Sequence, residues 1–280
     1  IVFANSVIGA RTERYPDLFD VCCAITGRVP AIGLHLTENR AGTLLLQLKN
    51  ITEALQASDD FYPVLGHFLG KTALERIPVI EGMGIIPNND QLKALGAAAA
   101  SSGAVALFHM VGVTPEAPTV EAAFQGNAPQ ETFTVTMDML RQARRELTHT
   151  DNARLDMVVL GSPHFSLAEF KKLAPLVAGL KKHAQVKFLV TSSRAMAQLA
   201  QQAGFIEPLE AFGAQLTVDT CILTTPMLPK EIQFLMTNSA KFAYYAPGLL
   251  DKKIAFGSLA DCVNSAIAGE IVRDETLWEN

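Results

Sequence analysis

The sequence lacks the features of membrane-spanning and nucleic-acid-binding chains. A transmembrane helix needs about 20 consecutive apolar residues, and the best stretch, residues 94–110, is interrupted by two glycines, two serines and a histidine. Basic residues are also sparse. They never form more than a pair, such as Lys181-Lys182, and the formal net charge is −5, whereas nucleic-acid binders usually show a basic stripe. We therefore expect no membrane span and no nucleic-acid partner.

Cysteine is scarce as well. The four cysteines, at positions 22, 23, 221 and 262, form no C-x-x-C pair and no regular framework, so we expect no disulfide scaffold. Free thiols are typical of the reducing cytoplasm, where we place the protein. The chain shows no secretory signal and no initiator methionine. Its first residues, Ile1-Val2-Phe3-Ala4, read as the end of a strand, and we expect a piece of a longer protein.

Apolar residues are abundant, and the runs that they form alternate along the chain between strand-like and helix-like. Of the 280 residues, 49% are hydrophobic, which is ample for one large core or two ordinary ones. Strand-like runs alternate with helix-like runs, and this alternation predicts an α/β fold of layered α/β/α units with mostly parallel sheets. Continuous Leu, Val, Ile and Phe runs predict strands buried on both faces at residues 155–160, 186–190, 214–218 and 232–236.

The domain boundaries are less clearly marked, because no repeat and no low-complexity linker divides the chain. We place a first α/β unit, lacking its N-terminal part, at residues 1–131 and a second at residues 132–250. The strand and helix of residues 251–280 are expected to return to the first unit. The polar stretch at residues 148–154 is an alternative, weak boundary.

Polar side chains follow each of the four predicted later strands. In a parallel sheet the carboxyl ends of the strands lie along one edge, where ligands bind. Hydroxyls, an Arg fork, a Lys and helix N-termini suit an anionic substrate. Helix capping explains any single loop equally well, but four such loops favour a site. The residues are Ser162, His164, Ser193, Arg194, Thr220, Cys221, Asn238, Ser239 and Lys241.

A second polar cluster lies near the start, with Asn5, Ser6, Arg11 and Thr12. It again indicates an anion site, or else a surface turn. Among the thiols, Cys262 has apolar neighbours and is interpreted as core, because free Cys is among the most buried residue types. Cys23 could also be core, and Cys22 and Cys221 are the more plausible metal ligands.

Short motifs along the whole chain together resemble the aconitase X family. Each motif alone would be weak, but they occur in family order. They are FANSVIGART at residues 3–12, AITGRVP at 24–30, GLH at 33–35, LKALGA at 92–97, FHMVGVTPEAP at 108–118, PH at 163–164, TSSR at 191–194, DTC at 219–221, TNSAK at 237–241 and FGSL at 256–259.

This resemblance implies an aconitase-like lyase that removes water from a small hydroxy carboxylic acid. Such enzymes use an iron–sulfur cluster, held by three cysteines, as a Lewis acid. A bacterial branch dehydrates cis-3-hydroxy-L-proline to a pyrroline carboxylate, and an archaeal branch dehydrates phosphorylated mevalonate. Residues 11–15 and 20–22 resemble the bacterial branch. So does Ser162, because the archaeal pattern has Cys before the Pro-His pair.

The resemblance also implies roles for single residues. Cys22 and Cys221 would bind the cluster, and the third ligand would be Cys23, Cys262 or a residue outside this chain. Arg194 and Lys241 would hold the substrate carboxylate and stabilise its enolate-like charge. The full set of implied substrate-binding residues is Asn5, Ser6, Arg11, Thr12, His35, His109, Ser162, His164, Ser193, Arg194, Thr220, Asn238, Ser239 and Lys241.

Part of the catalytic machinery is expected elsewhere. In the superfamily the base is a serine on a small swivelling domain, fused or separate, which is therefore the expected partner. We expect the present chain to fold but to be inactive alone. Two alternatives stay open. A mevalonate-phosphate dehydratase would need a phosphate site, and the sequence has no Gly-rich phosphate loop. A non-catalytic binding module could keep the fold without a competent site.

Overall fold

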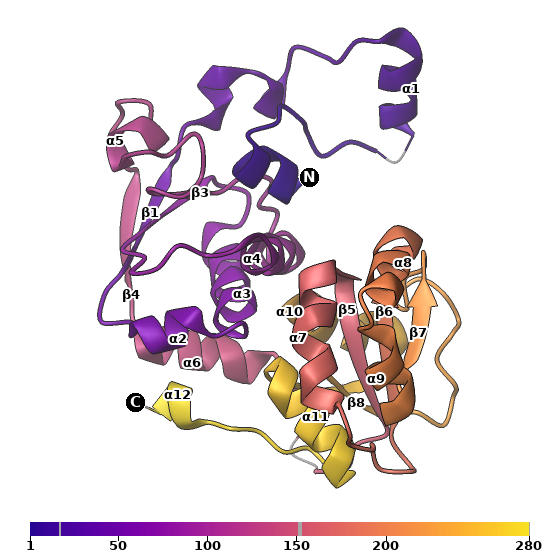
Figure 1. Cartoon of the computed structure of the whole chain (residues 1–280). Coiled ribbons are helices and arrows are strands. Elements are labelled where there is room, and N and C mark those ends of the chain that lie inside the picture. Colours follow the sequence, from indigo (N-terminus) through magenta and orange to yellow (C-terminus); the bar gives the residue numbers. More distant parts are fainter. Residues whose placement is uncertain (17, 151–152, 280) are drawn as a thin grey trace.

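Two parallel β-sheets organise the computed structural model, which describes residues 1–16, 18–150 and 153–279 (Figure 1). The first sheet has the order β3-β2-β1-β4, and the second has the order β7-β6-β5-β8-β9. All their strand pairs are parallel, so the predicted α/β class is confirmed. The strands are β1 Leu44–Leu48, β2 Pro78–Glu81, β3 His109–Met110, β4 Glu131–Val135, β5 Met157–Phe165, β6 Lys187–Ser192, β7 Gln215–Val218, β8 Phe234–Thr237 and β9 Lys253–Phe256.

Helices cover both sheets and begin at side-chain caps that the sequence supplies. Ser166 is one such cap, because its hydroxyl accepts a hydrogen bond from the backbone N–H of Glu169 while the Glu169 carboxylate accepts one from the N–H of Ser166. The α-helices are α1 Phe19–Thr26, α2 Glu53–Ala57, α3 Phe61–Ala73, α4 Asn89–Ser102, α5 Val120–Ala123, α6 Met137–Glu146, α7 Leu167–Val177, α8 Arg194–Gln202, α9 Ile206–Phe212, α10 Ala240–Leu250, α11 Leu259–Ala268 and α12 Thr276–Glu279.

The start of the chain differs from the expectation. Residues 1–4 were expected to end a strand, but they lead into a short π-helix, Ala4–Ile8. The turn forms because the backbone N–H of Asn5 bonds to the carbonyl of Ile1, and Gly9 closes it with a positive φ of 74°. Residues 104–108, which lead into β3, form no strand. There the N–H of Phe108 bonds to the hydroxyl of Ser6 rather than to a strand.

The predicted division between the two units also differs from the structure. Strand β4 pairs with β1 from Leu44 to Leu48, so residues 131–135 belong to the first sheet. Strand β9 pairs with β8, so it joins the second sheet rather than returning to the first. Hydrogen-bond pairing between distant strands decides both assignments. The alternative boundary at residues 148–154 includes residues 151 and 152, which lie outside the described residues.

Within described residues 251–279, the segment around α12 returns to the first unit. The indole N–H of Trp278 in α12 donates to the carboxylate of Asp60 over 2.8 Å, and the guanidinium of Arg144 lies 5.1 Å from the indole ring centroid. Burial raises the pKa of the Asp60 carboxyl, against the hydrogen bonds from Ser58 and Trp278 that lower it. The C-terminus is thus fastened by a buried polar contact.

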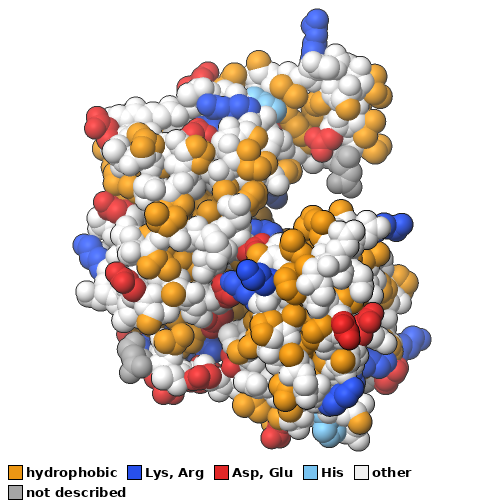
Figure 2. Space-filling view, in the orientation of Figure 1, with side chains coloured by type: hydrophobic (Ala, Val, Ile, Leu, Met, Phe, Trp, Pro, Cys, Tyr) orange, Lys and Arg blue, Asp and Glu red, His pale blue; other side chains and the backbone are white. Residues whose placement is uncertain are grey.

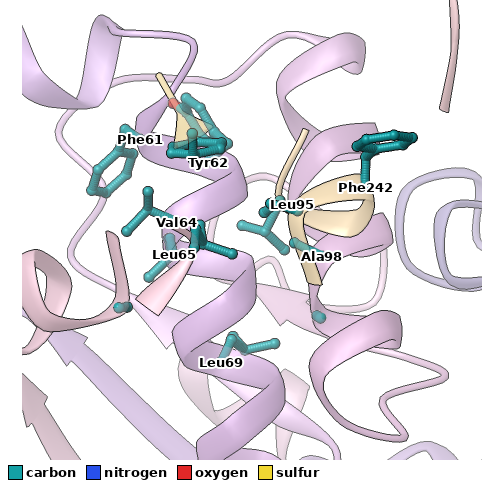
Figure 3. Close-up of a cluster of buried hydrophobic side chains, with 14 of the residues drawn as sticks. Phe61, Tyr62, Val64, Leu65, Leu69, Leu95, Ala98 and Phe242 are labelled. Atoms are coloured by element: carbon teal, nitrogen blue, oxygen red, sulfur yellow. The ribbon is translucent and has the colours of Figure 1, made fainter. Parts of the chain in front are cut away.

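A shared apolar core joins the two units. Helix α10 follows β8 of the second sheet, yet it packs on α3 and α4 of the first unit. Figure 3 shows this cluster, in which Phe242 of α10 lies beside α4, which carries Leu95 and Ala98. Helices α3 and α4 approach closely, since a Cβ on Gly66 would lie 2.3 Å from the carbonyl oxygen of Leu95. The interface therefore fixes the orientation of the second sheet.

In the described residues no helix is both long and apolar enough to span a bilayer.

Candidate functional site

A cavity of about 410 Å³ opens at the carboxyl ends of the second sheet. It brings together side chains that are up to 80 positions apart, as the sequence predicted for this edge. Of the predicted site residues, Ser162, His164, Thr220, Cys221 and Lys241 line it. The complete lining is Gly161, Ser162, Pro163, His164, Thr191, Thr220, Cys221, Ile222 and Lys241.

The last part of β5, residues 161–165, is a bulge where the pairing with β6 shifts, and it forms one wall of this cavity. Its first residue, Gly161, has a φ of 93°, and a Cβ there would lie 2.1 Å from the carbonyl oxygen of Thr191. Only glycine fits this close approach. The next peptide, Ser162–Pro163, is cis, and the carbonyl of Ser162 accepts a hydrogen bond from the hydroxyl of Ser239.

Two side chains tie the strand ends to each other. The Nε2–H of His164 donates to the carbonyl oxygen of Thr220 over 2.7 Å, which links the end of β5 to the residues that follow β7. The hydroxyl of Ser239 also accepts the N–H of Phe242 over 3.0 Å and so caps α10. Ser239 therefore acts as a cap as well as holding the β5 bulge.

Lys241 supplies a cation to the cavity. It lies in the first turn of α10, where the helix dipole adds positive potential. Its side chain forms no ion pair and no hydrogen bond within residues 1–16, 18–150 and 153–279. A narrower pocket next to the cavity is also lined by Lys241, together with Asn238 and Ser239. The arrangement suits a small carboxylate.

Arg194 is placed differently from the expectation. Its Nε donates to the carboxylate of Asp219 over 2.9 Å, and its backbone N–H donates to the other oxygen over 2.9 Å. These bonds hold the pKa of the Asp219 carboxyl below its usual value. The Arg194 side chain is 72% exposed and does not line the cavity. Ser193 caps α8 by accepting the N–H of Met196, so both residues have structural partners.

The N-terminal cluster surrounds an arginine that the sequence did not single out. Arg40 is fully buried, and its Nε donates to both carboxylate oxygens of Glu116 over 2.9 Å. Its remaining nitrogens donate to Leu34 O and Asn5 O over 3.0 Å. Burial opposes ionisation of Glu116, but the hydrogen bond and charge of Arg40 outweigh it and lower the pKa of Glu116. Asn5 thus belongs to a buried ion-pair network.

Two other predicted residues are held by the same network. His109 is 1% exposed and donates through Nε2 to the carbonyl oxygen of Arg40 over 2.7 Å. Burial lowers the pKa of His109, which therefore favours the neutral imidazole. Thr12 donates its backbone N–H to Asn5 Oδ1 over 3.0 Å. The sequence carried part of the signal for this network, because Glu116 lies within the motif at residues 108–118, but nothing indicated that it pairs with Arg40.

The remaining predicted residues of the first unit are Arg11, which is exposed, and His35, which is half-buried. A guanidinium nitrogen of Arg11 lies 4.0 Å from Glu116, and the side chain is 40% exposed. The Nε2 of His35 is hydrogen-bonded to the hydroxyl of Tyr15, and the two rings are stacked with centroids 5.6 Å apart. Neither lines the cavity of the second sheet.

A broad hollow separates the α1 segment from the second unit (Figure 2). Helix α1 has no buried residue, and Leu18, Val21 and Ile25 are 75%, 52% and 80% exposed. Cys22 is exposed on this helix, whereas Cys221 is half-buried beside the cavity. The expected approach of these two thiols stays a prediction.

The cysteines of the described residues do not gather into a metal site. Cys262 is fully buried in the apolar core of the second unit, where burial raises its pKa far above the usual value. Cys262 is not among the residues that line the cavity. Among the described residues, no group of three or more His, Cys, Asp or Glu side chains could hold a metal ion. The described donors therefore do not form a three-cysteine site.

Domain models of one family match nearly the whole chain. The aconitase X first-domain model matches residues 1–38, the second-domain model residues 42–145 and the third-domain model residues 155–268. The chain belongs to the aconitase X family. A crystal structure of the holo-form of Thermococcus kodakaraensis aconitase X has the same architecture, with a TM-score of 0.82 and 31% identity over 94% of this chain and 65% of that chain.

Curated relatives carry two different names. The cis-3-hydroxy-L-proline dehydratase of Pseudomonas aeruginosa is 46% identical over 99% of this chain and 48% of its own length. The enzyme of the same name from Hypocrea jecorina is 44% identical over 96% of this chain and 46% of its own length. The phosphomevalonate dehydratase large subunit of Methanocaldococcus jannaschii is 33% identical over 93% of this chain and 64% of its own length. The chain thus spans about half the length of both hydroxyproline dehydratases.

Proposed function

We propose that this chain is part of a hydro-lyase that dehydrates cis-3-hydroxy-L-proline to a pyrroline carboxylate. The supporting observation is that the chain is more similar to the hydroxyproline dehydratases than to the phosphomevalonate dehydratases. Identity is 46% and 44% to two hydroxyproline dehydratases, compared with 27–37% to five phosphomevalonate dehydratase large subunits. We also propose that the enzyme acts in the cytoplasm.

The cavity at the second sheet is the proposed substrate site. Dehydration breaks the C–H bond next to the carboxylate and the neighbouring C–OH bond, forms a C=C bond and releases water. Negative charge spreads onto the carboxylate as the proton leaves. Lys241, at the positive end of α10, is the cation placed to bind that carboxylate and to stabilise the added charge. Thr191 and Thr220 offer further polar groups in the same cavity.

The cofactor and the base are proposed from the family resemblance. A bound iron–sulfur cluster would supply a Lewis acid for the departing hydroxyl. Cys221 and Cys22 are the accessible thiols that could serve it, but the described residues do not make a three-ligand site, and we derive no step from the cluster. We propose that a small swivelling domain provides the base as a serine.

Turnover by the complete enzyme tests this function. We expect cis-3-hydroxy-L-proline to be converted and phosphomevalonate to be left unchanged. Lys241→Ala should lower kcat/KM about 10- to 100-fold, since a hydrogen bond to a charged group contributes about 1.5–3 kcal/mol. Lys253→Ala, at the amino end of β9 and so at the opposite edge of the sheet, is the matched control and should retain activity. Absence of turnover, or preference for phosphomevalonate, would refute the proposal.

A further inference from the structure

We propose that Lys93, on α4 of the first unit, is a positioning residue for the cavity of the second unit. It fixes the bulged last part of β5, residues 161–165, which forms one wall of that cavity. The inference rests on the proposed function in one respect, namely which reaction slows when Lys93 is lost. Lys93 lines the narrower pocket beside the cavity but not the cavity itself, so it acts on the cavity through the residues that it holds.

The Lys93 ammonium has a complete set of acceptors. Its Nζ lies 3.2 Å from the carbonyl oxygen of His164, 2.5 Å from Glu169 Oε2 and 3.0 Å from Asp90 Oδ1. An ammonium has three N–H donors, so each can be matched with one acceptor. The side chain is 22% exposed, and its position is therefore defined by contacts rather than by solvent.

A serine connects the two carboxylates that flank Lys93. The hydroxyl of Ser166 donates to Asp90 Oδ2 over 2.7 Å, and the backbone N–H of the same residue donates to Glu169 Oε2 over 2.8 Å. Asp90 lies in the first turn of α4, and Ser166 is the cap of α7. The beginnings of α4 and α7 are thus fastened to each other directly beside the end of β5.

The contact with His164 extends the connection to the cavity. Lys93 binds the carbonyl of His164, while the imidazole of the same residue donates to Thr220 O over 2.7 Å. Cys221 follows Thr220 and lines the cavity. One continuous set of hydrogen bonds therefore runs from the first unit to both walls. Misplacement by about 1 Å can reduce a rate by about 10²-fold, so loss of this support should affect turnover.

The charges around Lys93 explain why the ammonium is needed. Burial lowers the pKa of Lys93, but Glu169 and Asp90 raise it by more, and the net shift is upward. Burial raises the pKa of Glu169, although the charge of Lys93 lowers it. Removing the ammonium would leave two carboxylates beside the carbonyl of His164 with no cation. The bulge would then move away from its present position.

Lys172 offers a matched control. Its Nζ lies 2.8 Å from the carboxylate of Asp59, so it also joins α7 to the first unit. Both side chains are 41% exposed. Lys172 also lines the narrower pocket, but in the part of the chain that the structure describes its hydrogen bonds and ion pair go to Asp59 and none goes to residues 161–165. Loss of Lys172 removes an ion pair between the units but leaves the cavity wall supported.

The experiment compares Lys93→Met and Lys172→Met in the complete enzyme. With cis-3-hydroxy-L-proline, Lys93→Met should lower kcat at least tenfold while KM changes less than threefold, and Lys172→Met should stay within twofold of the unmodified enzyme. Lys93→Ala should regain part of its kcat when ethylamine is added. A kcat of Lys93→Met within twofold of the unmodified enzyme, or equal losses in the two Met variants, would overturn the proposal.

A second readout does not depend on turnover. The rate of alkylation of Cys221 by iodoacetamide, followed by peptide mass mapping of the metal-free protein, should change at least threefold in Lys93→Met and remain unchanged in Lys172→Met. If the proposed function is wrong, the unmodified enzyme will not turn over the substrate, but this difference will persist. Should Lys93→Met not fold, Lys93→Gln replaces it, because Gln keeps a hydrogen-bond donor but lacks the charge. Unmodified kcat and Cys221 reactivity in Lys93→Gln would then overturn the proposal.

Discussion

Phe242 provides the sharpest test of the shared core. It belongs to α10 of the second unit but is completely buried in the cluster that includes α3 and α4 of the first unit (Figure 3). The Phe242→Ala substitution would leave a cavity between the two units. If the units depend on each other for stability, this one substitution should lower the free energy of unfolding of both.

The expected loss follows from burial of the whole ring. Phe→Ala substitutions in a core cost about 3–5 kcal/mol, from lost transfer free energy and the cavity that remains. The unfolding entropy of 280 residues is about 0.6 kcal/mol/K, at about 2.1 cal/mol/K per residue. The melting temperature should therefore fall by about 5–8 °C.

Urea unfolding followed by circular dichroism, together with calorimetry, measures this loss. Leu249→Ala, on the same helix but with a side chain that is 60% exposed, should change the free energy of unfolding by less than about 0.5 kcal/mol. A loss below about 1 kcal/mol for Phe242→Ala would contradict the buried interface. Two separate transitions, of which only one shifts, would show that the units unfold independently.

Three further predictions concern stability. Trp278→Phe leaves the buried Asp60 carboxylate without the indole N–H and should cost about 1–3 kcal/mol in urea unfolding; an unchanged midpoint would mean that the C-terminal turn contributes nothing. Gly66→Ala places a Cβ against the Leu95 carbonyl oxygen and should cost about 1–3 kcal/mol, whereas a neutral effect would contradict the close packing. Burial lowers the pKa of His109 below 6.5, so protonation favours the unfolded chain and stability should decline as the pH falls below 6.5. His109→Gln should reduce that decline in unfolding measured between pH 7.5 and 5, and an identical pH profile would refute this assignment.

The amino-acid sequence by itself determined the class of the fold and one edge of the candidate site. The apolar runs before Gly161, Thr191, Asp219 and Thr237 predicted four parallel strands, because local runs of this kind suit strands buried on both faces. The polar residues directly after them had to lie at one edge of a parallel sheet. The structure accordingly places Ser162, His164, Thr220, Cys221 and Lys241 around one cavity.

The tertiary structure alone decided which charged side chains are available to a ligand. Arg194 and Lys241 look equivalent in the sequence, but Asp219 binds Arg194 while Lys241 remains in the cavity. The pairing of Arg40 with Glu116 joins residues 76 positions apart, and Lys93 reaches His164 across 71 positions. Local sequence patterns report the type and period of an element. Ion pairs between distant elements depend on how the sheets and helices pack, and no local pattern contains that information.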